Sequence, residues 1–166
     1  MAERQMGWTN NLQEPKRLNR FELLFLKDDN LRLTCHTVSI PNISVDEVQI
    51  DRMHEKYYVA GSKVTYGEVK LSFYDYVDNK AAKALLDWYT TIYDQGTSLM
   101  GYPQDYKQDL TLLVYGPDHS VVESWLFVGA WPKAYDRPGM DWKDGQGIRN
   151  VEVTLRIDQA KLTLSA

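Results

Sequence analysis

The sequence has few of the residues on which most redox, disulfide and metal chemistry depends. Cys35 is the one cysteine among 166 residues, which excludes an internal disulfide framework and any multi-cysteine zinc site. The three histidines, His36, His54 and His119, lie in different segments. None belongs to an H-x-x-x-H or H-E-x-x-H spacing, so the sequence predicts no metal site.

Long apolar runs are also missing. The longest near the start is Leu23–Leu26, whereas a helix that spans a membrane needs about 20 apolar residues. The first residues, Met1–Gln5, contain no apolar segment of the kind found in Sec signal peptides. We therefore expect neither a secretion signal nor membrane insertion by the chain itself.

Positive charge is not in excess. Lys and Arg total 19, Asp and Glu total 23, and the formal net charge is −4. Domains that bind nucleic acid tightly are usually strongly basic, so this balance argues against such binding as the main function. The hydrophobic share of 43% and the length are those of one globular domain.

Catalytic residue types occur only in unsuitable arrangements. Asp118–Ser120 contains the residues of a hydrolase triad, but neighbours in a turn cannot adopt triad geometry. Cys35 lies in an apolar segment, where a free thiol behaves as a small hydrophobe. Gly145 and Gly147 lack the third glycine and the strand-to-helix setting of a phosphate-binding loop. We therefore predict no catalytic, cofactor-binding or metal-binding residue, which favours a structural or binding protein.

Alternating apolar and polar residues dominate the chain and predict a mainly β protein. The expected strands are residues 20–26, 31–40, 43–52, 68–77, 109–115, 120–135 and 150–157, of which the first two form a hairpin. Gly129 and Pro132 interrupt the 120–135 strand, where proline is expected to end the pairing. A change of phase at Asp46 and Glu47 indicates a bulge or bend.

One segment changes to a helical period. It predicts a helix over about 79–95, with Asp78 as its N-cap and Gly96 as its end. Strands, then one helix, then further strands describe an antiparallel two-sheet β-barrel or sandwich with one flanking α-helix. We expect an N-terminal arm at residues 1–18 and a single domain at 19–166.

Two segments are expected outside the core. Residues 1–18 are polar and aperiodic, and form either a solvated arm or one that becomes ordered on a partner. Residues 53–65 are too long for a tight hairpin and too polar for the core, so we predict an extended projecting loop. This loop either forms a contact in an assembly or is a local loop that stays mobile until assembly.

Aromatic residues are abundant. Eleven tyrosines and five tryptophans are many for this length, and such residues are favoured at interfaces. They could stack on bases, but few Lys or Arg lie near them to hold phosphates. We expect most in the core or at a subunit interface. For Trp131 and Pro132, a tryptophan that closes the core at a corner is favoured over an inter-subunit seam.

Three groups of segments share their order and spacing with a known family. They are Leu33–Pro41 followed by Tyr57–Gly61; Leu86–Tyr89; and Trp125–Pro132 followed by Met140–Trp142 and Val151–Leu155. In combination they resemble the tail tube proteins of contractile-tailed bacteriophages, over about residues 19–160. The combination is fairly specific, although no single segment is.

The resemblance implies a two-sheet β-barrel whose copies form hexameric rings by sharing sheets. The rings would stack into a hollow tube inside a contractile sheath in the virion tail, after assembly in the host cytoplasm. Implied partners are further copies of the chain, the sheath protein, the baseplate tube initiator and the tail terminator. Tape measure protein and viral DNA would occupy the lumen without specific binding, which the net negative charge suits.

The resemblance and the projecting segments together suggest contact residues between subunits or rings. They are Tyr57, Tyr58, Val59, Ala60 and Gly61 of the predicted loop, Lys16 and Arg17 of the arm, and Arg137 and Lys143 of the glycine-rich loop. Tyr57 and Tyr58 would be rigid anchors, and Gly61 would allow a turn. Exposed ion pairs contribute only about 0–1 kcal/mol each, so Arg137 and Lys143 would set register.

Other functions fit the same residues. One is a tube protein of type VI secretion, the Hcp family, which shares this fold. Another is the baseplate ring that starts tail assembly, although such initiators generally have longer chains. A small carbohydrate- or nucleotide-binding β-barrel is the alternative from a different class, and it would be monomeric.

Overall fold

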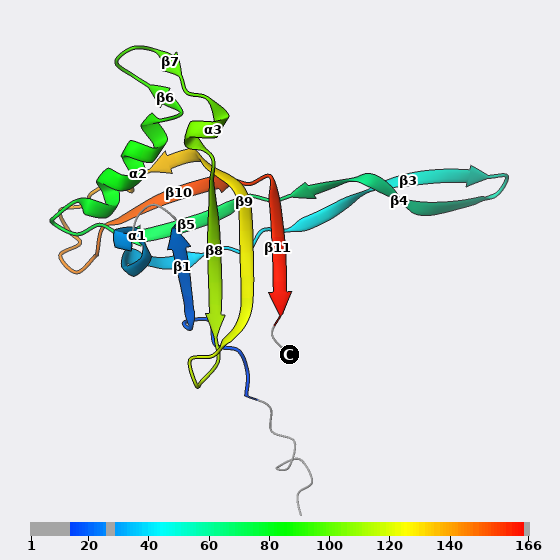
Figure 1. The fold of residues 1–166 in the computed structure, drawn as a ribbon, viewed down its shortest axis with the longest axis horizontal. Coiled ribbons are helices and arrows are strands. Elements are labelled where there is room, and N and C mark those ends of the chain that lie inside the picture. The colour runs from blue at the N-terminus through cyan, green and yellow to red at the C-terminus, as the bar shows by residue number, and fades with distance from the viewer. Residues whose placement is uncertain (1–13, 26–28, 165–166) are drawn as a thin grey trace, which may run out of the picture.

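The computed structural model describes residues 14–25 and 29–164 of the chain (Figure 1). The elements are β1 (Phe21–Phe25), α1 (Asp29–Thr34), β2 (Cys35–Val38), β3 (Ile43–Arg52), β4 (Glu55–Tyr66), β5 (Val69–Tyr74), α2 (Lys80–Thr90), β6 (Tyr93–Asp94), β7 (Leu99–Met100), α3 (Pro103–Tyr106), β8 (Gln108–Tyr115), β9 (Val121–Asp136), β10 (Asn150–Arg156) and β11 (Gln159–Leu164). The predicted mainly β architecture with a flanking helix is confirmed.

The main sheet is antiparallel and folds into two layers. Its strand order is β1-β8-β9-β10-β5-β2, and β11 also pairs with β9. The first layer contains β1, β8, β11 and the beginning of β9, and the second contains the end of β9 with β10, β5 and β2. In the described residues β1 and β2 do not pair with each other, so the expected barrel is an open two-layer structure.

Strand β9 passes from one layer to the other at Gly129. Residues 123–128 pair with β11, and residues 131–136 pair with β10. Gly129 has φ +65°, and a Cβ there would lie 2.3 Å from Asp158 Oδ2. Its N–H donates to Asp109 Oδ1 at 2.8 Å, and Asp158 N–H donates to Val128 O at 3.0 Å. Glycine is needed here because residues with a side chain rarely adopt this φ, and their Cβ would collide with the Asp158 carboxylate.

The proline after the corner does not end the strand. Pro132 is almost fully buried and lies opposite Leu155, so the prediction that it stops the pairing is wrong. The register shifts between Thr154 and Leu155, and such a bulge tolerates the missing N–H. Trp131, beside the corner, is half-buried, with its ring centroid 6.1 Å from that of Tyr106.

The core fills the space between the layers and under α2. Its largest fully buried side chains include Phe73, Phe127, Leu23, Leu71, Leu85, Leu110 and Leu155. Helix α2 contributes Ala81, Ala82, Leu85 and Trp88. Both alanines precede Leu85 by three or four residues and Trp88 follows it by three, so the four share one face. No helix in the described ranges combines the length and apolarity that crossing a membrane requires.

The predicted hairpin between residues 20–26 and 31–40 is wrong. Residues 29–34 form α1, β1 pairs with β8, and the short β2 pairs with β5. Leu31 is buried whereas Leu33 is exposed, so the alternation of these leucines does not mark one strand face. Contact of Leu31 with the core, across distant sequence, outweighs the local pattern.

Helix α2 is shorter than expected, and β11 follows the last predicted strand. The N-cap is Asn79, while Asp78 Oδ1 accepts the Lys80 N–H at 3.3 Å. At the other end Thr90 and Thr91 donate their hydroxyls to carbonyls of the last turn, which competes with helix continuation before Gly96. Beyond the predicted 150–157 strand the chain turns at the same corner and adds β11.

The strained geometry at Gly129 predicts how a side chain there affects stability. Gly129→Ala places a Cβ against the Asp158 carboxylate and forces an L-residue into positive φ, so we expect it to lower the free energy of unfolding by about 1–3 kcal/mol. Urea unfolding at fixed protein concentration measures this change. Gly139→Ala is the matched control, because nothing lies within 4 Å of its added Cβ. Equal stability of the two variants would show that the corner is not strained.

Candidate assembly interface

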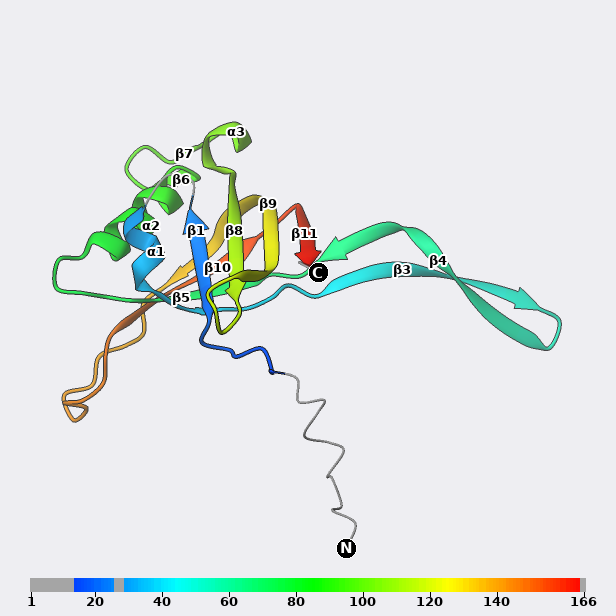
Figure 2. The ribbon, with the colours of Figure 1, turned by 60° about the horizontal axis from the view of Figure 1, so that its bottom comes forward.

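A long β-ribbon projects from the body of the molecule. Strands β3 and β4 pair only with each other in the described chain and extend away from both layers (Figure 1, Figure 2). The predicted loop at residues 53–65 is therefore wrong in structure, because it consists mostly of β4. Its projecting, exposed position is as expected. The turn is at Met53, which has φ +40°.

The outer half of the ribbon is amphipathic. Val48 pairs with Val59 and Ile50 with Tyr57, so these four side chains share one face, and each is between 36% and 50% exposed. Gln49 and its partner Tyr58 belong to the opposite face. A two-stranded ribbon is marginally stable alone in water, and a contiguous exposed apolar surface marks an interaction site. We call these four residues the apolar stripe.

A bulge divides the ribbon. The register shifts between Val45 and Glu47, which confirms the bulge indicated by the change of phase. A Cβ on Gly61 would lie 2.7 Å from Asp46 O. Gly61 therefore permits the close approach of the two strands at the bulge, and its expected role in a turn is wrong.

Four of the five ribbon residues predicted as contacts divide between two faces, and the fifth, Gly61, lies at the bulge. Tyr57 and Val59 belong to the apolar stripe, while Tyr58 and Ala60 alternate onto the other face. Val48 and Ile50 complete the stripe but were not predicted as contacts. Their alternation with the polar Glu47, Gln49 and Asp51 is visible in the sequence and was the signal that could have found them.

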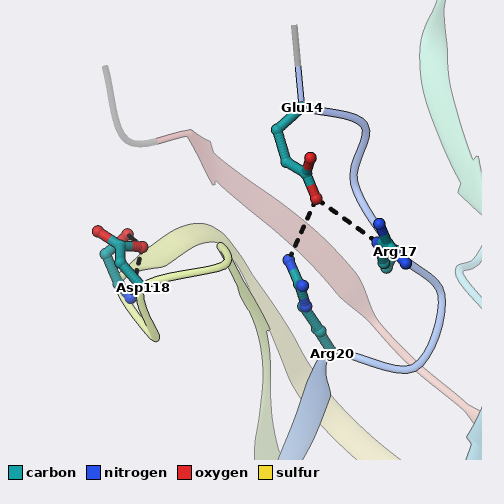
Figure 3. A network of polar contacts seen from close by, with 5 residues as sticks. Glu14, Arg17, Arg20 and Asp118 are labelled. Atoms are coloured by element: carbon teal, nitrogen blue, oxygen red, sulfur yellow. Dashed lines mark hydrogen bonds and ion pairs between the residues drawn. The ribbon is translucent and has the colours of Figure 1, made fainter.

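The predicted arm contacts have partners within their own chain. Lys16 Nζ lies 2.6 Å from Glu123 Oε2. Arg17 Nε lies 3.5 Å from Glu14 Oε1, which is also 3.7 Å from Arg20 (Figure 3). Residues 1–13 of the predicted arm lie outside the described residues. The role of Lys16 and Arg17 between subunits stays a prediction.

The remaining predicted contacts lie in and beside the 137–149 loop. Arg137 Nε donates to Tyr135 Oη at 2.9 Å, and its Cζ lies 5.8 Å from the centre of that ring. Lys143 is exposed near the loop's centre. The same loop also exposes two large apolar side chains, Met140 and Trp142, which the predicted contacts did not include.

The residues that sequence analysis considered for chemistry are poorly placed for it in the described part of the chain. Among the described residues no group of three or more His, Cys, Asp and Glu side chains can hold a metal. Burial raises the pKa of the Cys35 thiol to about 12, which makes it a poor nucleophile. Asp118 accepts hydrogen bonds from the N–H and hydroxyl of Ser120, as expected of a turn residue.

The two-layer β domain with a projecting amphipathic ribbon is typical of a structural protein. The sequence matches the phage tail tube protein family over residues 8–160, and the chain belongs to that family. It is 25% identical to tail tube protein gp19 of Enterobacteria phage T4 over 131 residues, covering 78% of this chain and 80% of that one. The corresponding protein of phage T6 is 24% identical.

Solved structures share the fold. The cap of the anti-feeding prophage has a TM-score of 0.75 at 17% identity, covering 93% of this chain and 94% of that one. A sheath–tube complex of the PVC extracellular contractile injection system has a TM-score of 0.73 at 18% identity, covering 93% and 95%. Hcp1 of Flavobacterium johnsoniae has a TM-score of 0.53 at 10% identity, covering 87% and 95%. The protein is thus a structural component of the virion tail and not an enzyme.

Glu123 joins the arm to the body through its ion pair with Lys16. Hydrogen bonds from Lys16 and then from Trp125 lower the pKa of Glu123 below its usual 4.5. A carboxylate whose pKa is lowered by folding stabilises the fold above its ordinary pKa, and this contribution is lost as the pH falls through the lowered value.

We therefore expect Glu123→Gln to reduce stability at pH 7 by less than about 1 kcal/mol, because Lys16 is half exposed. The difference from the wild type should shrink steadily below pH 4.5. Urea midpoints between pH 7 and pH 3 measure it, with Lys16→Gln as the control for the partner. A difference that is unchanged by pH would contradict the ion pair.

Proposed function

We propose that copies of this chain form hexameric rings that stack head to tail into the hollow inner tube of a contractile tail. The ribbon carries the proposal, because its apolar stripe is uncovered in the described chain. β-Ribbons with such a face gain stability by packing on a partner. Within residues 14–25 and 29–164, the outer edges of β1, β2 and β11 have no paired strand, and they offer neighbours further strand pairing.

The contact is expected to be heterologous. The ribbon projects on one side of the body (Figure 2), so the surface that receives it in another copy is a different part of the molecule. Contacts of this kind close into rings or continue as filaments. One small chain can therefore build a long tube by repetition.

The tube is proposed to lie inside a sheath and to guide the genome into the host. Its partners are the sheath protein, the baseplate tube initiator and the tail terminator. The names of solved relatives support this set, since they describe a sheath–tube complex, a sheath/tube terminator and a baseplate. Tape measure protein and DNA pass through the lumen without specific binding, and assembly takes place in the host cytoplasm.

Residues 19–166 act as one domain in this proposal, and residues 1–18 are an arm that contacts a neighbour. Tyr57 and Val59 supply the main apolar contact. Lys143 and Arg137 pair with acidic residues of a neighbour and set register rather than supply stability, because exposed pairs contribute little.

Electron microscopy tests the proposal. The purified wild type should form rings or long tubes with an axial hole. The double variant Ile50→Ser, Tyr57→Ser removes a cross-strand pair of the apolar stripe, so we expect rings or tubes to be lost, while the core and its unfolding transition remain. Sedimentation at several concentrations measures the same loss.

The control is Gln49→Ser, Asp51→Ser, on the ribbon face opposite the stripe. It should assemble as the wild type does. A wild type that stays monomeric at high concentration, even with a baseplate or tape measure partner, would overturn the proposal. Normal tubes from the stripe variant would show that the ribbon is not the contact.

A further inference from the structure

The inner face of the first layer is only partly covered by the second. Cross-strand neighbours form three successive rows on this face: Phe25, Leu110, Phe127 and Ala160; Leu23, Leu112, Trp125 and Leu162; and Phe21, Val114, Glu123 and Leu164. All members of the first row are buried, whereas Leu162 in the second row is 44% exposed and Leu164 in the third is 62% exposed. The core therefore opens toward the beginning of β9 and the end of β11.

The second layer does not extend over this opening. Strands of the two layers cross, and the lower ends of β8, β9 and β11 extend past β5 (Figure 1). Strand β2 ends at Val38, and Ile40 beyond it is exposed. A cavity of about 200 Å³ lies between the layers here, lined mainly by Phe21, Val38, Ile40, Leu112 and Val114. We call this cavity, with Leu162 and Leu164, the apolar mouth.

We propose that the apolar mouth receives the β3–β4 ribbon of a second copy of this chain. The proposal rests on the proposed function, and adds the surface that accepts the ribbon. The second β layer covers the buried half of the inner face of the first layer. Another β layer of similar shape would bury the exposed half in the same way. The ribbon is a β layer with one apolar face, and apolar faces of two sheets pack about 10 Å apart.

A second copy fits better than the chain's own ribbon. The ribbon extends outward from the body, away from the mouth (Figure 1, Figure 2). Donor and acceptor surfaces are thus both present on each copy but do not meet within it. This is the arrangement that produces a heterologous contact, in which every copy donates once and accepts once.

Charge also favours this occupant. The cavity is lined by two basic side chains, Lys16 and Arg17, and one acidic side chain, Glu123. The ribbon, residues 43–66, has four acidic and three basic residues. The two surfaces therefore have net charges of opposite sign, which assists approach and orientation.

Disulfide trapping in assembled protein tests the proposal. Cys35→Ala first removes the native thiol, and Leu164→Cys is combined with Tyr57→Cys in one chain. Oxidation of rings or tubes should give a ladder of covalent dimers and larger species on a non-reducing gel. The matched control combines Leu164→Cys with Tyr58→Cys, on the opposite ribbon face, and should give at least about fivefold less product.

The outcomes of the trapping distinguish the proposed acceptor surface from the proposed function. Rings or tubes without the ladder, an equal yield from Tyr58→Cys, or a disulfide only within one chain would overturn the proposed acceptor while the proposed function stands. A wild type that forms no rings or tubes would overturn the proposed function itself. A mixture of Leu164→Cys chains with Tyr57→Cys chains, both lacking Cys35, should stop at dimers, because each chain then has one thiol.

A second measurement needs no new thiol. Leu162→Ser combined with Leu164→Ser removes exposed apolar surface from the mouth, so we expect the concentration for half-maximal assembly to rise about tenfold. Thr163→Ser, between them on the outer face of β11, is the control and should leave assembly unchanged. An unchanged assembly concentration in the double variant would overturn the acceptor assignment.

Discussion

The corner at Gly129 is the constraint on which the remaining structure depends. One continuous strand, β9, supplies pairing edges to β8 and β11 before the corner and to β10 after it. The corner requires positive φ, a side-chain-free approach to Asp158, and a hydrogen bond to Asp109. Because β10 and β11 follow β9 around the same turn, the two layers face each other and enclose one core.

The same corner explains what the molecule leaves uncovered. Crossed layers overlap only in part, so the inner face of the first layer is buried near Phe127 and exposed near Leu164. The ribbon lies outside both layers and has no core of its own. A donor and an acceptor of apolar surface therefore arise from one fold, and association of copies can bury both.

Surface ion pairs contribute less than apolar burial to the proposed association of copies. The ion pairs of Lys16 and of Arg17 lie at the surface and fix local geometry, where each contributes little to stability. The proposed tube depends on contacts whose free energy comes from removing valine, isoleucine, leucine and tyrosine surfaces from water. Association of this kind is less sensitive to salt than one based on charge.

The sequence by itself determined the mainly β class, the family, the helix near Trp88, the bulge beside Asp46 and the exposure of residues 53–65. These are local signals, carried by alternation, by glycine and proline, or by a set of motifs. Only the tertiary structure decided that β1 pairs with β8 and that Leu31 belongs to a helix, because strand pairing depends on side chains distant in sequence. It also decided which ribbon residues share a face and where the core is open, because alternation becomes a surface only once the register is set.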